Sequence, residues 1–193
     1  METSVNTVCL GCGHPHEMKA WSNIDVCSQP ELKEKVLSGE LFSWKCSGCG
    51  KVNLVKYPLM YHDSSEKLLL VLSDTALNVA DLPEGYTARR VRSVGDLVEK
   101  IKIFDAGLDD VVMELCKYVT LTELGKKVDL RFLKLEGADN ELIFTYPENS
   151  QMEMLSVGFN VYEDARGIVS RHPAIKTDGL QLVDADWLST LLG

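Results

Sequence analysis

The sequence of 193 residues predicts an α+β fold from three observations. Two matched cysteine turns lie 33 residues apart in the N-terminal third, the middle of the chain has apolar residues at helical spacing, and alternation typical of strands begins near Lys127. We therefore expect an N-terminal four-cysteine zinc ribbon with an inserted helix, followed by a helical segment and an antiparallel β-meander. The expected domains are a zinc-ribbon domain with its helical insert over 1–63 and an α+β domain over 64–193, with packing of both into one unit as the alternative.

The cysteine pattern carries the strongest signal. Cys9 and Cys12 form one C-x-x-C-G turn, and Cys46 and Cys49 form the other. Each turn lets two sulfurs converge on one ion, and a glycine after the second cysteine can adopt positive φ, which leaves backbone N–H groups free to point at the thiolates. Two such turns complete a closed tetrahedral site, so we expect one structural Zn²⁺ per chain and no position for a reacting water.

Other assignments of the cysteines stay open. A redox dithiol would open a helix inside a βαβ pattern, which neither pair does, and an iron site has a similar ligand set. His14 and His16 follow the first turn, but four cysteines already satisfy the ion. Cys116 lies on a helical pattern and is expected in the core, whereas Cys27 precedes a helix and has no evident role.

The insert between the turns is expected to hold a strand over 17–26 and then a short helix. Residues 28–31 (Ser-Gln-Pro-Glu) resemble a capping box, and Gly39 is placed to end the helix. Strands are expected over 41–45 and 51–57, on either side of the second turn.

Past the ribbon, residues 61–63 precede a turn and a strand over 67–72. His62 beside Asp63 suggests a base with an orienting carboxylate, but neighbouring residues of an extended chain point to opposite sides, so we favour a turn or packing role.

Two helices are expected in the middle of the chain. Ser93 and Asp96 form a cap for the first, and Asp109 with Asp110 lies in the first turn of the second, where the helix dipole favours anions. Capping explains this carboxylate pair without catalysis. Three arginines precede the first helix, namely Arg89, Arg90 and Arg92. They suggest either an anion site at the N-terminus of the helix or, as we favour, a solvated basic cluster.

The last third is expected to form the meander. Strands over 128–135 and 141–146 are separated by a turn at 137–140, residues 147–150 form another turn, and residues 152–157 and 159–162 are expected as one bent or two short strands. Asp184 is placed to cap a final helix.

Several of these segments together resemble a known family. The two C-x-x-C-G turns, the segments 30–41 and 57–63, and Gly107 to Asp110 leading a helix are similar to bacterial CpXC-domain proteins over about residues 9–125. The resemblance implies a paired metal-binding motif at the four cysteines and a bacterial cytosolic setting, but no activity. The proline that gives the family its name is replaced by Leu10 and Ser47, which affects the rigidity of the turns rather than ligation.

Composition and charge restrict the functions. With 45% hydrophobic and 25% charged residues, the chain is typical of a globular protein, and its longest apolar stretch, 68–72, is far shorter than the roughly 20 residues of a membrane span. The N-terminus shows no export signal, so we expect a cytoplasmic protein that does not contact a membrane. The net charge of −9 falls outside residues 1–60, which hold six lysines and six acidic residues, so nucleic acid is not a favoured partner.

Three functions remain open. We favour a zinc-stabilised binding or adaptor protein with protein partners, because the metal site is closed and no catalytic set is recognisable. The alternatives are an enzyme or small-molecule sensor with a pocket between the ribbon and the C-terminal sheet, and a nucleic-acid-associated zinc ribbon. A nucleic-acid-binding ribbon would present several lysines on one face beside Trp21 or Trp44. The lysines concerned are Lys19, Lys45, Lys51 and Lys56.

Overall fold

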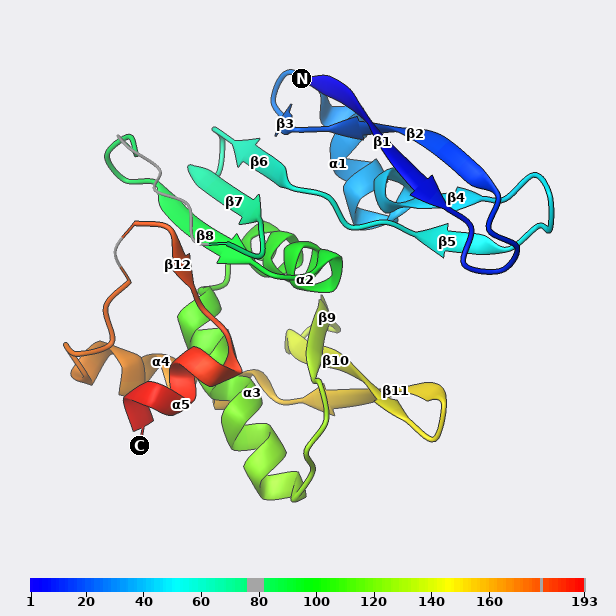
Figure 1. Cartoon of the computed structure of the whole chain (residues 1–193). Helices are drawn as coiled ribbons and strands as arrows, with labels where there is room; N and C mark the ends of the chain where they lie inside the picture. The colour runs from blue at the N-terminus through cyan, green and yellow to red at the C-terminus, as the bar shows by residue number, and fades with distance from the viewer. Residues whose placement is uncertain (76–81, 178, 193) are drawn as a thin grey trace. The chain divides into compact units, whose positions relative to one another are not determined.

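The computed structural model describes residues 1–75, 82–177 and 179–192, which form two compact units (Figure 1). The first unit runs from Met1 to Val98 and includes a short segment that ends at Gln181, and the second comprises Glu99–Thr177 and the chain from Leu182 on. The expected boundary after residue 63 instead lies in the turn of a β-hairpin, whose two strands pair within the first unit. The α+β class is confirmed.

The first unit begins with the cysteine-bearing ribbon. Strands β1 (Glu2–Val8) and β2 (Pro15–Trp21) form an antiparallel hairpin with the first cysteine turn at its tip. The second cysteine turn likewise joins β4 (Ser43–Lys45) to β5 (Val52–Leu54), which pair antiparallel. The hairpin around the second turn is therefore as expected but shorter, whereas β1 was not anticipated.

The inserted helix α1 (Pro30–Leu37) is present and buries Leu32 and Val36. Its predicted capping box is wrong, because Gln29 occupies the cap without a side-chain hydrogen bond, and the Ser28 hydroxyl instead donates to Asp25 at 2.8 Å. Proline at the first helical position explains why the helix still begins there. Gly39 has φ of 76° and separates α1 from a short 3₁₀ turn, η1 (Glu40–Phe42).

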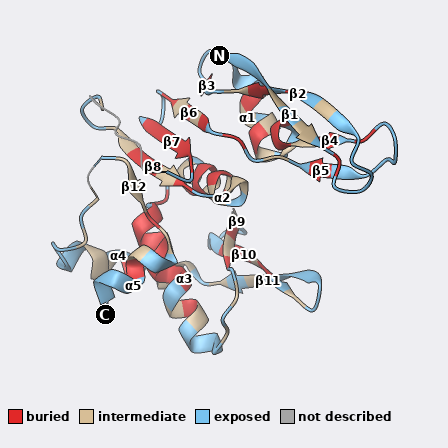
Figure 2. Cartoon of the chain, in the orientation of Figure 1, coloured by how far each residue is buried: buried red, intermediate tan, exposed pale blue. Residues whose placement is uncertain are grey.

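A mixed sheet completes the first unit. Its strand order is β12-β8-β7-β6-β3, with β3 at Asn23–Asp25, β6 at Leu59–Asp63, β7 at Leu68–Leu72, β8 at Thr87–Val91 and β12 at Gln181–Leu182. The β6–β7 pair is antiparallel, but β3 runs parallel to β6 and β7 parallel to β8. All five residues of β7 are buried, as Figure 2 shows, because this strand lies in the interior of the sheet.

Helix α2 (Val94–Asp105) begins in the first unit and continues in the second unit from Glu99 on, and the second unit also contains α3 (Asp110–Leu124). Both predicted caps are confirmed: Ser93 and Asp96 exchange two hydrogen bonds of 3.0 Å, and the Asp109 carboxylate accepts from the amides of Val111 and Val112. The expected meander follows as β9 (Arg131–Glu136), β10 (Glu141–Glu148) and β11 (Gln151–Val157), in the order β11-β10-β9.

One element of the second unit differs from its prediction. Residues 159–162 are not a strand but the first turn of α4 (Phe159–Arg171), which buries Tyr162 and Ala165. The aromatic and β-branched residues favour a strand locally, but their spacing presents one apolar face to the core, where Cys116 is fully buried as expected. The final helix α5 (Ala185–Leu192) begins at Asp184, whose carboxylate accepts from the amide of Trp187. None of the helices in the described ranges has the length and apolarity that crossing a membrane requires.

Candidate metal centre

The sulfurs of Cys9, Cys12, Cys46 and Cys49 all lie within 4.8 Å of one another. The Cys9 and Cys49 sulfurs are 3.5 Å apart, and those of Cys12 and Cys46 are 3.6 Å apart. These separations are far longer than a disulfide bond of about 2.0 Å. They are close to the ~3.8 Å edge of a tetrahedron with Zn–S bonds of about 2.3 Å. The four thiols can therefore hold one metal ion.

The two cysteine turns have the same backbone geometry. In the first turn the Cys9 amide donates to His14 O at 2.8 Å and the Gly13 amide donates to Cys9 O at 2.8 Å. In the second turn the equivalent bonds, from Cys46 to Lys51 and from Gly50 to Cys46, are both 2.9 Å long. This repetition brings two sulfurs of each turn toward the same point.

The glycines explain how each turn closes. Gly13 and Gly50 have φ of 72° and 73°, the left-handed values expected from the sequence for the position after the second cysteine. Gly11 serves a different purpose: a Cβ atom there would lie 2.9 Å from Cδ of Lys51 and 3.4 Å from the sulfur of Cys49. The absence of a side chain at Gly11 thus lets the two turns approach each other.

Asn53 links the two turns and was not singled out in the sequence. Its Oδ1 accepts from the Leu10 amide at 2.9 Å, and its Nδ2 donates to Cys9 Sγ at 3.5 Å and to Lys51 O at 3.0 Å. Asn53 is 3% exposed. Alternation along β5 places Asn53 on the face opposite to Val52 and Leu54. A polar residue at this inward position is the sequence signal that could have identified Asn53 as a functional residue.

Hydrogen bonding separates the thiols in acidity. Burial raises the pKa of Cys9, but donors that include the Gly11 amide and Asn53 outweigh it and lower that pKa to about 6. A backbone hydrogen bond at His14 lowers the pKa of Cys12, yet contacts with the Cys49 and Cys46 thiols dominate and raise it to about 12. The Cys9 thiolate therefore forms readily, whereas Cys12 resists further negative charge, which a divalent cation would neutralise.

The nearby histidines lie outside this donor set. The four-residue cluster contains cysteines alone, and His16 stacks on Trp44 with ring centroids 4.1 Å apart. An ion held by all four cysteines would have a closed ligand set.

Of the other residues singled out in the sequence, the structure brings Cys27 and Asp63 together, since the Cys27 thiol donates to the Asp63 carboxylate at 3.7 Å. His62 Nε2 lies 3.2 Å from the Tyr86 hydroxyl, whereas the buried Asp63 accepts from Ser65. The two side chains thus leave β6 in different directions, as alternation along a strand requires. The thiol of Cys27 is exposed and accepts a 3.1 Å hydrogen bond from Ser64, which lowers the pKa of Cys27.

The three arginines do not form a solvated cluster before a helix. Arg89 and Arg90 belong to β8, and Arg89 is only 5% exposed. Arg90 instead donates to Asp74 O at 3.1 Å, and Arg92 O accepts from Lys56. The prediction was wrong because β8 was missed, and strand alternation sends Arg89 and Arg90 to opposite faces of the sheet.

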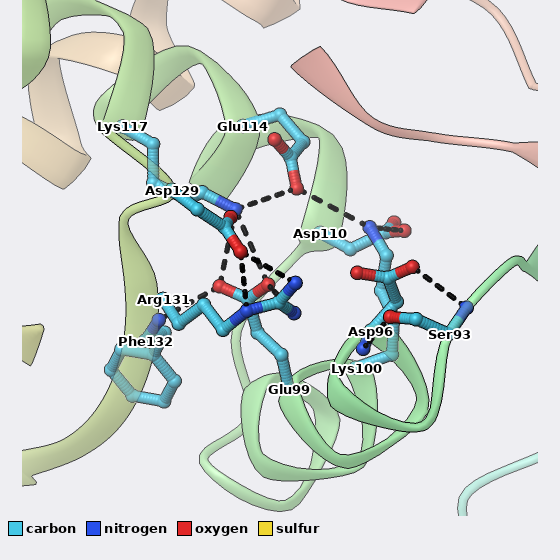
Figure 3. Close-up of polar contacts among 10 residues, drawn as sticks. All are labelled: Ser93, Asp96, Glu99, Lys100, Asp110, Glu114, Lys117, Asp129, Arg131 and Phe132. Carbon is cyan, nitrogen blue, oxygen red and sulfur yellow. Dashed lines mark hydrogen bonds and ion pairs between the residues drawn. The ribbon is translucent and has the colours of Figure 1, made fainter. Parts of the chain in front are cut away.

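A second polar cluster, which no sequence pattern indicated, lies inside the second unit. Figure 3 shows carboxylates and ammonium groups from α2 and α3 in mutual contact. Lys100 Nζ lies 2.8 Å from Asp110 and 3.7 Å from Glu114, and Lys117 Nζ lies 3.1 Å from Glu99 and 3.2 Å from Glu114. All five residues are at most 9% exposed. We call them the buried charge network.

The five residues comprise three carboxylates and two ammonium groups, and the Arg131 guanidinium lies 3.8 Å from the Glu99 carboxylate. Burial raises the pKa of Glu114, and the attraction of Lys117 and Lys100 only partly opposes this effect. Burial alone would lower the pKa of Lys117, but Glu99 and Glu114 hold it above the ordinary lysine value. Glu114 shares both of its lysines with other carboxylates, so their attraction does not cancel the effect of burial on its pKa.

Comparison with known proteins gives one match. A family model described as "CpXC protein" matches residues 7–117, which contain all four clustered cysteines. No curated protein and no solved structure matches the chain.

Proposed function

The chain belongs to the CpXC family, and from the four-thiol centre inside the matched region we propose that it is a zinc-stabilised protein-interaction module. The observation that carries the proposal is the convergence of four sulfurs within 4.8 Å. Four protein ligands fill a tetrahedron, so the ion has no open position for a substrate or water. Such a site stabilises the fold that presents other surfaces.

Zinc is the ion that we propose for this centre. Zn²⁺ has no geometric preference from d-electrons and commonly occupies closed sites of two C-x-x-C turns, although iron accepts the same ligands. The proposal includes a reducing, cytoplasmic setting, in which six thiols stay free of disulfides.

The arrangement of lysines and aromatic rings favours proteins over nucleic acid as partners. Of the four lysines, Lys19 pairs with Glu2 at 3.1 Å and Lys56 pairs with Asp74 at 2.5 Å, so half of the set already faces a carboxylate. Trp44 is 7% exposed and covered by the stacked His16, so its ring is not available to a base.

Metal analysis of Cys46→Ser and the intact chain tests the metal role. We expect about one zinc per intact chain, and loss of zinc together with unfolding of the ribbon in the variant. Cys27→Ser is the matched control, because Cys27 is an exposed cysteine outside the cluster and its variant should keep the metal. An intact chain that is purified metal-free and remains fully folded would contradict the proposal, and bound iron would contradict the choice of zinc.

Affinity capture from the source cells tests the interaction role. The zinc-loaded chain should enrich specific proteins that Cys46→Ser does not. Equal recovery with both forms, or recovery of nothing above background, would refute an interaction role while leaving the metal assignment intact.

A further inference from the structure

The outer face of the β4–β5 hairpin leaves aliphatic side chains uncovered. Val52 and Leu54 are 60% and 77% exposed, whereas Asn53 between them is buried against the cysteine turns. Alternation therefore divides β5 into an inner side that supports the metal centre and an outer side that contacts no core. Val52 and Leu54 are two positions apart, which is also the spacing of side chains on one face of an extended peptide.

The outer edge of β5 also has unpaired backbone groups. Within the described part of the chain this sheet has two strands, β4 and β5. The Cys46 amide donates to Lys51 O and the Val55 amide donates to Phe42 O, so Cys46–Lys51 and Phe42–Val55 are hydrogen-bonded pairs of the hairpin. Pairs alternate along an antiparallel ladder, so the N–H and C=O groups of Val52 and Leu54 point away from β4. This edge can accept another strand.

Lys45 gives the outer face a positive charge, and Lys51 adds charge near it from the side of β5 that Asn53 occupies. Lys45 lies directly opposite Val52 in the register and thus on the same face, and Lys51 immediately precedes β5. Both are exposed, and no ion pair joins either one to a carboxylate among the residues that the structure describes. The stem of Lys51 lies close to Gly11, which holds that side chain beside the ribbon.

We infer that the outer edge of β5 binds an extended acidic peptide segment of a partner protein, which adds a strand to the hairpin and sets its aliphatic side chains on Val52 and Leu54. The inference rests on the proposed interaction role and names the class of partner. Main-chain hydrogen bonds along the edge supply affinity, and Lys45, on the same face as Val52, selects acidic side chains.

Two other occupants fit this surface less well. A second copy of the chain would place its own Lys45 and Lys51 beside those of the first, and juxtaposed like charges oppose binding. A single-stranded nucleic acid would satisfy the lysines, but Val52 and Leu54 offer no aromatic ring on which a base could stack.

The test uses the full zinc-loaded chain and a fluorescein-labelled peptide of alternating glutamate and leucine. Fluorescence anisotropy should report saturable, salt-sensitive binding. Lys45→Glu and Leu54→Ser should each weaken binding about tenfold or more, a change of about 1.4 kcal/mol. A lysine–leucine peptide should not bind, and prolines in the glutamate peptide should abolish binding because they remove the N–H donors that pair with the edge.

The matched controls lie in the second unit. Met154→Ser removes a strand side chain that is 62% exposed, close to the 60% of Val52, and Lys127→Glu reverses another exposed lysine. Both variants should bind the glutamate peptide as the unchanged chain does. Zinc content, measured for every variant, shows that Lys45→Glu and Leu54→Ser retain the ribbon.

Four results would overturn the inference. These are no peptide binding at up to about 1 mM, binding that ignores Lys45→Glu and Leu54→Ser, displacement of the peptide by a single-stranded oligonucleotide, and self-association that Leu54→Ser abolishes. Partners captured by the zinc-loaded chain and still captured by Lys45→Glu would leave the interaction role standing while removing β5 as its site.

Discussion

The Glu99 carboxylate accepts a 2.7 Å hydrogen bond from the backbone amide of Phe132, as Figure 3 shows. The contact joins the middle of α2 to the start of β9, 33 residues later in the chain. Phe132 lies on the edge strand of its sheet, so the carboxylate satisfies a buried donor that no neighbouring strand takes up within the described residues. The same carboxylate neutralises Lys117 at 3.1 Å. Glu99 thus accepts a backbone hydrogen bond and balances the charge of a buried lysine.

Glu99→Ala should therefore lower the free energy of unfolding by about 3–5 kcal/mol, the usual result of removing one partner from a buried ion pair. The variant leaves the Phe132 amide without its acceptor and leaves Glu114 as the remaining carboxylate partner of Lys117. Urea denaturation measures the effect. Glu136→Ala is the control, because its pair with Lys134 is exposed and should contribute at most about 1 kcal/mol. Equal losses in the two variants would show that the buried charge network is not stabilising.

Glu114 makes the stability of the second unit depend on pH. Its pKa is raised in the native state, chiefly by burial, so the folded protein holds this proton more tightly than the unfolded chain does. The resulting stabilisation is complete below the ordinary glutamate pKa and is lost as pH rises through the native value. Glutamine imitates the protonated form, so Glu114→Gln should gain stability relative to the unchanged chain as pH rises.

Urea denaturation over a series of pH values checks this prediction. Glu123→Gln, at an exposed position near the end of the same helix, should give a curve parallel to that of the unchanged chain. The prediction fails if the stability difference between Glu114→Gln and the unchanged chain is constant with pH or moves in the opposite direction. Either result would show that the native pKa of Glu114 is not raised.

Asn53→Leu should weaken zinc binding while keeping the four cysteines. The change removes a donor to Cys9 Sγ and the acceptor of the Leu10 amide. Loss of such an outer contact typically costs 10–100-fold in metal affinity. Competition with a chromophoric chelator measures the affinity. Asn6→Leu, an exposed asparagine on β1, is the control and should retain the affinity of the unchanged chain. Unaltered binding by Asn53→Leu would show that the cysteine turns need no support from β5.

The convergence of the four cysteines was predictable from sequence because its determinants are local. Each cysteine turn is specified within six residues, and the predicted positive φ of Gly13 and Gly50 is observed. The caps at Ser93 and Asp109 were predictable for the same reason. Helix α4 was missed because the aromatic and β-branched residues that begin it favour a strand, and only packing on the core of the second unit decides for a helix.

The buried charge network was not predictable, because it depends on contacts between distant segments. Glu99 and Lys100 look like the solvated face of an amphipathic helix, and their burial requires partners from α3 and β9. The same limit applies to Arg89 and Arg90, whose separation depends on the pairing of β8 with β7. Periodicity predicts which residues share a face, but not which face another element will cover.

The two kinds of glycine in the cysteine turns should respond differently to alanine. Gly13 has φ of 72° with open space around a prospective Cβ, so Gly13→Ala incurs only the cost of the left-handed backbone, about 1–2 kcal/mol. Zinc affinity should fall about fivefold to thirtyfold. Gly13→Asn should recover part of this loss, because asparagine tolerates left-handed φ better than alanine does.

Gly48→Ala is the matched control within the other turn. Gly48 does not have positive φ, and a Cβ atom there would make ordinary contacts of 3.7 Å with Cys46 Sγ and 3.8 Å with Cys12 Sγ. Its alanine variant should bind zinc as tightly as the unchanged chain, or slightly more tightly because alanine restricts the unfolded chain. If Gly13→Ala and Gly48→Ala lowered the affinity equally, crowding of the sulfurs would be the common cause, and backbone strain at Gly13 would not explain the requirement for glycine.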